Sequence, residues 1–332
     1  MIGGLLSLLS AIIFAYSSAF VRRGVLTGTV FQAMAISLPI GLPIFAIVML
    51  MTGGFGALAD FSNVSIALLA LVGVIHFGAA RYCNYRATKA MGTNLVAPVQ
   101  QFSLVITLVL AVAWLDERMT VLRLIGIALV IAGPALMLVP ERRKMKPVSL
   151  SAAADESVGR FKPNLAEGYF FATVSSFGFG LSPILIRMAF EAKGIAVGVA
   201  GGFVSYVAAT LAVGLLLLAP ERRRRESRID AVAAKWFAVS GVAICFSQLF
   251  RYMALGIAPV SVVIPIQRLS VIFRVYFGWI MNPQHEVFNG RMISATVTSL
   301  IGALALSVST DSIAQFVPLP AWSVPVLAWH WP

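Results

Sequence analysis

Long apolar runs separated by short polar connections make up most of the sequence. Two of them occupy most of residues 84–138, joined by the charged residues 116–118, and each is long enough to cross a bilayer as a helix. The first run also contains Pro98, Gln100 and Gln101, whose polar groups need partners that lipid cannot supply. The pattern predicts a transmembrane helical hairpin whose first helix faces protein or water on one side.

The same pattern recurs along the chain. Runs of roughly 18 to 22 apolar residues predict ten transmembrane helices. They cover residues 2–21, 30–51, 64–83, 93–113, 122–139, 166–188, 197–219, 236–254, 260–281 and 292–309. Residues 140–165 are charged and then rich in serine and alanine, so we expect a flexible polar linker between residues 1–139 and residues 166–310. The tail, residues 311–332, is rich in proline and tryptophan; we expect an interfacial segment, with a disordered end as the alternative.

The two sets of five helices are related by an internal duplication. Shifts of 167 and then 169 residues superpose polar, aromatic, proline and glycine positions in the same order. The pairs include Tyr85 and Tyr252, Pro98 and Pro265, Gln100 and Gln267, Glu117 and Glu286, and Gly133 and Gly302. Because five is an odd number, the second copy enters the membrane upside down. The sequence therefore predicts an all-α integral membrane protein built from two inverted five-helix repeats, as in many transporters.

Composition excludes several classes of protein. Of the 332 residues, 59% are hydrophobic and 11% charged, and the mean hydropathy is +0.91, which does not suit a soluble enzyme. The net charge of +12 comes from basic residues in short clusters between apolar runs, where they orient helices in the membrane. Nucleic acid is therefore not an expected partner, whereas membrane lipids are.

Lysine and arginine are concentrated in the odd-numbered connections. These include Arg22 and Arg23 after the first predicted helix and the run 222–225, whereas the even-numbered connections hold few basic residues. By the positive-inside rule the odd-numbered connections are cytoplasmic and both termini lie outside.

Polar residues inside the predicted helices are neutral or basic. All 13 acidic residues fall in connections or at helix ends, while Arg268 and Arg274 lie within residues 260–281. A charge at the centre of a membrane helix costs about 2.5 to 3.5 kcal/mol even on the lenient insertion scale. Gln267 and Arg274 share one helix face, and Arg268 lies about 100° away. We expect an aqueous cavity lined by at least one arginine; the alternative is that the arginines extend to the membrane surface.

Other candidates for chemistry have simpler explanations. His76 stands alone on an apolar helix, so a hydrogen bond within the bundle is favoured over a role in proton coupling. Asp116 and Glu117 stand at a helix start, where acids stabilise the helix dipole, and do not form a catalytic pair. No cluster of histidine, acid and serine predicts an enzyme, and no cofactor or metal is expected.

The hairpin resembles a known family. The turn 115–120, the residues Leu124, Ile125 and Gly126 after it, and the pair Ala132 and Gly133 are similar to the EamA-type repeat of the drug/metabolite transporter superfamily. The second half departs from this pattern at residues 282–286. The resemblance implies a secondary transporter of small metabolites with a central cavity between two halves. It also implies cytoplasmic termini, which disagrees with the charge distribution.

The resemblance implies which residues line the cavity. Helices 3 and 4 would face helices 8 and 9, so the candidates for lining or gating are Tyr85, Gln100, Gln101, Tyr252, Gln267 and Arg268, with Arg274 added from its own helix position. Pro98 and Pro265 would supply kinks.

We expect alternating-access transport of a small metabolite, anionic or amino-acid-like, in a bacterial inner membrane. The alternatives are a broad exporter of neutral or lipophilic compounds and a non-transporting structural or interaction protein of the membrane. The expected partners are the small-molecule substrate and the lipids, and a homodimer is left open.

Overall fold

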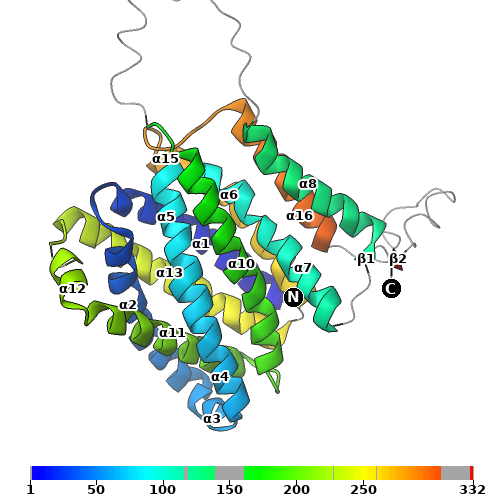
Figure 1. The fold of residues 1–332 in the computed structure, drawn as a ribbon. Helices are drawn as coiled ribbons and strands as arrows, with labels where there is room; N and C mark the ends of the chain where they lie inside the picture. The colour runs from blue at the N-terminus through cyan, green and yellow to red at the C-terminus, as the bar shows by residue number, and fades with distance from the viewer. Residues whose placement is uncertain are drawn as a thin grey trace, which may run out of the picture.

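The computed structural model describes residues 2–115, 119–138, 161–226, 228–258, 260–307 and 330–331. Within these ranges the chain is almost entirely helical (Figure 1). In the described part of the chain, eight helical segments are long and apolar enough to cross a membrane, so the chain is a multi-pass integral membrane protein, as expected. Residues 139–160 and 308–329, which hold most of the expected linker and tail, lie outside the described residues.

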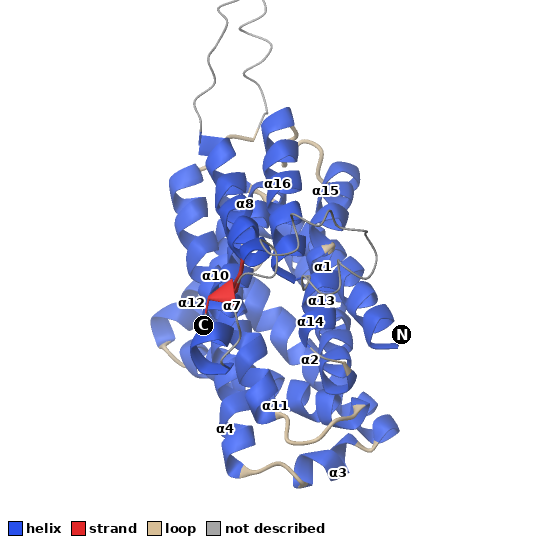
Figure 2. Ribbon diagram, turned by 90° about the vertical axis from the view of Figure 1, so that its right-hand side faces the viewer, coloured by secondary structure: helices blue, strands red, loops and turns tan. Residues whose placement is uncertain are grey.

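The helices follow one another with short connections. In residues 1–139 they are α1 (Ile2–Thr27), α2 (Val30–Thr52), α3 (Gly54–Ala59), α4 (Asn63–Val72), the π-helix η1 (Gly73–Ala80), α5 (Arg81–Met91), α6 (Thr93–Gln100), α7 (Phe102–Leu115) and α8 (Val121–Leu138). After the linker they are α10 (Leu165–Ala189), α11 (Ile195–Leu217), α12 (Pro220–Glu226), α13 (Ala231–Ile257), α14 (Val260–Arg268), α15 (Ser270–Met281) and α16 (Gly290–Ser307). Two short strands, β1 (Met119–Thr120) and β2 (His330–Trp331), pair antiparallel and form the small red element in Figure 2.

Polar caps start several helices where the sequence supplies them. Thr29 and Gln32 form a capping box at α2: the Thr29 hydroxyl accepts from the Gln32 amide at 3.0 Å, and the Gln32 side chain accepts from the Thr29 amide at 2.9 Å. Asp230 caps α13 by accepting from the Ala233 amide at 3.2 Å. These caps satisfy N–H groups that the helix itself cannot bond.

Two of the predicted spans are broken near the middle. The first breaks at Gln101, between α6 and α7, and the second at Leu269, between α14 and α15. At each break an amide bonds the carbonyl three residues before it: Gln101 to Pro98 at 3.2 Å and Leu269 to Ile266 at 3.1 Å. A proline lies in the helix before each break, Pro98 in α6 and Pro265 in α14. The two breaks are therefore alike in both position and bonding.

Helices α8 and α16 lie side by side at the edge of the bundle (Figure 1). Each presents a glycine to the other. A Cβ atom on Gly133 would collide with the Ser299 hydroxyl and lie 2.8 Å from the Ala295 carbonyl oxygen. A Cβ atom on Gly302 would lie 2.7 Å from the Val130 nitrogen and 2.8 Å from the carbonyl oxygen of Gly126. Small residues here let the two backbones approach closely.

Several helix boundaries differ from those expected. Helix α1 continues to Thr27, so Arg22 and Arg23 belong to the helix and not to the connection. Helix α13 begins at Ala231 and continues to Ile257, beyond both ends of the predicted span 236–254. The fifth and tenth expected spans are the helices α8 and α16, whose apolar stretches, Leu124–Leu136 and Gly290–Ala305, are shorter than the eight long ones.

Candidate functional site

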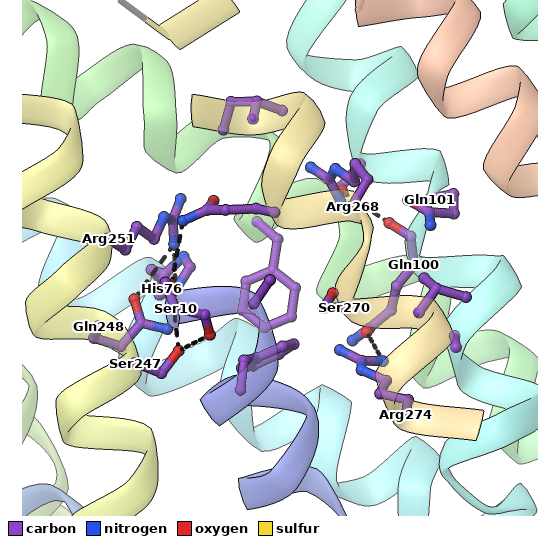
Figure 3. Close-up of a pocket in the computed structure, with 18 residues that line it drawn as sticks. Ser10, His76, Gln100, Gln101, Ser247, Gln248, Arg251, Arg268, Ser270 and Arg274 are labelled. Carbon is purple, nitrogen blue, oxygen red and sulfur yellow. Dashed lines mark hydrogen bonds between the residues drawn. The ribbon is translucent and has the colours of Figure 1, made fainter. Parts of the chain in front are cut away.

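A polar cavity lies between the two halves of the chain, and about 100 Å³ of it is accessible to water (Figure 3). This space is large enough for several water molecules. Its polar lining comes from α1, η1, the α6–α7 break, α13, α14 and α15. The residues are Ser10, His76, Gln100, Gln101, Ser103, Ser247, Gln248, Arg251, Gln267, Arg268, Ser270 and Arg274.

The break at Leu269 explains why both expected arginines line this cavity. On one continuous helix Arg268 would lie on a face adjoining that of Arg274. Helix α14 ends at Arg268, however, and α15 begins at Ser270, so the two segments need not share one helical face. The structure brings Gln267, Arg268, Ser270 and Arg274 to the same cavity.

One side of the cavity is built around Arg268 and Arg274 (Figure 3). Arg268 Nη1 donates to the Ser103 hydroxyl at 3.0 Å. Arg274 Nη1 donates to Gln100 Oε1 at 2.5 Å, and its guanidinium lies 4.6 Å from the centre of the Phe14 ring. Gln100 is held from its other end, where Nε2 donates to Asn84 Oδ1 at 2.5 Å. The partners that fix both arginines are thus neutral.

The other side is built around Arg251, which the sequence reasoning missed (Figure 3). Arg251 Nη1 bonds His76 Nε2 at 3.0 Å, and Nη2 donates to the Ser182 hydroxyl at 3.3 Å. Its exposed fraction is 7%. A signal was present in the duplication, because the shift of 167 residues places Arg251 on Asn84, which accepts a hydrogen bond from the cavity residue Gln100.

His76 is neutral in this arrangement. A guanidinium can only donate hydrogen bonds, so the Nε2 atom that bonds Arg251 must accept, and the proton is on Nδ1. The residue lies in η1, and π-helical turns are frequent at functional sites.

Several polar atoms of the cavity have no hydrogen-bond partner within the described protein. They include the Nε atoms of Arg251, Arg268 and Arg274 and both amide atoms of Gln101, whose exposed fraction is 1%. No Asp or Glu of the described chain lines the cavity. Buried polar groups normally find partners, so the nitrogen donors among these atoms are suited to holding an anionic ligand.

The remaining expected residues lie in different places. Gln267 lines the cavity and donates to the Ser10 hydroxyl at 3.4 Å. Tyr85 lines a neighbouring cavity of about 20 Å³, together with His76 and Phe179. Tyr252 lies outside both, in the main hydrophobic core, where its hydroxyl donates to the Ser205 hydroxyl at 3.0 Å.

A second buried polar cluster lies where the α15–α16 connection meets the start of α6. The Glu286 carboxylate accepts from the Thr93 amide at 2.8 Å, the Thr93 hydroxyl at 2.5 Å and the Asn94 amide at 3.1 Å. Its position at a helix N-terminus is one that anions favour. Burial raises the pKa of Glu286, while Arg22 and the hydrogen bonds from Thr93 and Asn94 oppose that rise.

Comparisons with known proteins agree with the membrane-transporter interpretation of the first half. Residues 1–139 match the family described as the EamA-like transporter family, which confirms the resemblance found in the hairpin. No curated protein matches the sequence. Among 27 matching chains of solved structures, one described only as "Crystal structure of protein" has a TM-score of 0.58 at 14% identity. The match covers 94% of this chain and 98% of the other, and at this identity it shows a shared fold alone.

Proposed function

We propose that this chain, whose residues 1–139 form an EamA-like domain of the drug/metabolite transporter superfamily, is a secondary active transporter of a small anionic metabolite. One observation carries the proposal: Arg251, Arg268 and Arg274 line one cavity in which no described residue is a carboxylate. The transporter works by alternating access, with the cavity as its substrate site. The match to the EamA-like transporter family does not specify the substrate or the direction of transport.

The energetic argument favours an anion. Each arginine at membrane depth costs free energy unless it is paired or faces water. The partners of Arg268 and Arg274 here are a hydroxyl and an amide, which supply no opposite charge. A carboxylate or phosphate offers two acceptor oxygens to the planar guanidinium, and such charge-assisted hydrogen bonds are about twice as strong as neutral ones. The binding of an anion would therefore offset the free-energy cost of holding these arginines at membrane depth without a counter-charge.

Alternating access would use two inverted five-helix repeats. Two observations support this arrangement. The glycine contacts between α8 and α16 are reciprocal under the shift of 169 residues, which relates Gly133 to Gly302 and Val130 to Ser299. The breaks at Gln101 and Leu269 also have matching bonding patterns. In this proposal α8 and α16 are the fifth and tenth spans, and the breaks after Pro98 and Pro265 are the hinges.

Transport into liposomes tests the proposal. Purified full-length protein is reconstituted, and uptake of labelled carboxylates and phosphate monoesters is compared with uptake of neutral compounds of the same size. We expect saturable uptake of anions that falls by about tenfold or more in Arg268→Gln. Arg187→Gln, which removes an exposed arginine of α10, serves as the matched control and should keep wild-type uptake.

Other outcomes would contradict the proposal in distinct ways. Equal uptake of anions by the wild type and Arg268→Gln would make the arginine structural. Saturable uptake of neutral lipophilic compounds alone would favour a broad exporter. Wild-type protein that moves none of the compounds would favour a structural or interaction protein.

A further inference from the structure

The positions of the positive charges around the cavity indicate how many acidic groups the substrate carries. Three arginines line it, and their Nε atoms lack partners within the described protein. His76 adds no charge, because its Nε2 atom accepts from Arg251. The positive charge of the lining is therefore that of the three guanidinium groups.

The side-chain hydrogen-bond partners of the three arginines within the described chain are all neutral. Glu286 lies outside the cavity, and its ion-pair partner is Arg22, with 3.8 Å between Arg22 Nε and Glu286 Oε1. Arg268 donates to the Ser103 hydroxyl, and Arg274 donates to the side-chain oxygen of Gln100. The side-chain hydrogen bonds of Arg251 go to His76, Gln248 and Ser182, which are all neutral. None of the three guanidinium groups therefore has a carboxylate partner at the cavity within the described chain, and positive charge remains on each of its two sides.

The two sides of the cavity carry these charges separately. Figure 3 shows Arg251 with His76 and Gln248 on one side, and Arg268, Arg274 and Gln101 on the other. Neutral and apolar side chains complete the wall, among them Phe14 and Phe179. A ligand that bridges the two sides meets a cationic group at each end.

We propose that the substrate is a dianion with its two acidic groups on separate atoms, a dicarboxylate or a molecule of that type. One group binds Arg268 and Arg274, with the Gln101 amide as an additional donor, and the other binds Arg251. This inference rests on the proposed transport function and specifies its substrate class. A monoanion bound on one side leaves the positive charge of the other side without a counter-charge in a site of low dielectric, where an unpaired charge is costly.

The test compares ligands that differ in charge and hardly in size. Malonate, succinate and glutarate are each paired with their half-amide and their diamide, and thermal unfolding of the purified full-length protein is followed at constant ionic strength. A ligand that binds the folded state raises the unfolding temperature. We expect the best dicarboxylate to bind about tenfold or more tightly than its half-amide, because the half-amide lacks one charge-assisted contact. The diamide should give no shift.

Variants of Arg251 make the test specific. Arg251→Gln removes one positive charge, so the dicarboxylate and its half-amide should bind about equally, while half-amide binding stays near its wild-type value. Arg251→Lys keeps the charge and should keep the preference. Arg187→Gln, exposed on α10, should leave every ligand shift unchanged.

The outcomes separate this inference from the proposed function. Equal wild-type binding of dicarboxylates and half-amides would overturn the dianion while leaving an anion transporter intact. Sulfate carries its two negative charges on one group. If sulfate binds as tightly as the dicarboxylates, the inference that the substrate has two separate acidic groups is overturned. If no dicarboxylate shifts the unfolding temperature, the inference fails even where other anions are transported. Stabilisation by diamides alone would overturn both proposals.

Discussion

Arg22 and Glu286 are buried against each other, with 3.8 Å between Arg22 Nε and Glu286 Oε1 and exposed side-chain fractions of 1% and 0%. Arg22 also donates to the carbonyl oxygens of Thr88 at 2.9 Å and His285 at 2.6 Å. The pair thus ties α1, the end of α5 and the start of α6 to the α15–α16 connection. Along α1, Arg22 follows the cavity residues Ser10 and Phe14, so we expect this cluster to close one end of the transport path.

Removing the Glu286 carboxylate should destabilise the protein. In Glu286→Ala the buried amides of Thr93 and Asn94 lose their acceptor and Arg22 loses its counter-charge, for a loss of about 3 kcal/mol or more in the free energy of unfolding. Glu286→Gln keeps an acceptor oxygen and should lose less. Thermal unfolding in detergent measures both. Glu191→Ala is the control: this exposed carboxylate also accepts bonds at a helix start, from Ser62 and Ser65, and its loss should change little. Equal unfolding temperatures for Glu286→Ala and wild type would contradict the assigned role.

The same carboxyl should make stability depend on pH. Burial raises the pKa of Glu286 in the folded state above its ordinary value, so the folded chain holds this proton more tightly than the unfolded chain does. Its contribution to stability is complete below the ordinary carboxyl pKa of about 4.3 and is lost as pH rises through the raised pKa. Relative to Glu286→Gln, the wild type should therefore lose stability as pH increases. The measurement is the difference between their unfolding temperatures across that range. If the wild type instead becomes more stable relative to Glu286→Gln as pH rises, the attraction of Arg22 lowers the pKa of Glu286 by more than burial raises it.

Gly92 should not tolerate a side chain. Its φ of +85° is rarely adopted by other residues, and a Cβ atom would lie 2.6 Å from Glu286 Oε2. We expect Gly92→Ala to cost about 1 to 3 kcal/mol of unfolding free energy, since strain and displacement of the carboxylate act together. Gly214→Ala is the matched control, because this glycine of α11 has open space around it and alanine favours helix. If the Gly92→Ala and Gly214→Ala proteins are equally stable, the positive φ of Gly92 and its close approach to Glu286 do not exclude a side chain.

The α8–α16 contact should be sensitive to single methyl groups. Gly133→Ala places Cβ on the Ser299 hydroxyl and against the Ala295 carbonyl, so the helices must separate, at a cost of about 1 to 3 kcal/mol. Adding Ser299→Ala removes the hydroxyl but not the carbonyl, so it should restore part of the loss. Comparison of unfolding temperatures for the single and double variants measures the coupling. No recovery in the double variant would mean that the carbonyl clash alone sets the cost.

The sequence predicted the polar cavity residues better than it predicted their arrangement. Gln100, Gln101 and Arg274 were identified because polar side chains inside apolar runs need partners other than lipid. Arg268 was assigned to an adjoining face because a continuous helix was assumed, and the break at Leu269 could not be located from proline alone. Arg251 stands near the end of the predicted span 236–254, and at a helix end one turn decides whether an arginine is buried or exposed; α13 continues to Ile257, and Arg251 is buried.

The sequence by itself determined that the chain is a helical membrane protein, roughly where its spans lie and that its first half is EamA-like. The physical reason is local: a bilayer demands apolar segments of a fixed length whose backbone bonds are made within each helix. Only the tertiary structure decided that three arginines share one cavity, that Glu286 is fully buried although it lies in a connection, and that Tyr252 belongs to the core. Those facts depend on contacts between segments far apart in the chain, such as Arg22 with Glu286, and the hydrophobic pattern of a single segment carries no information about its distant partner.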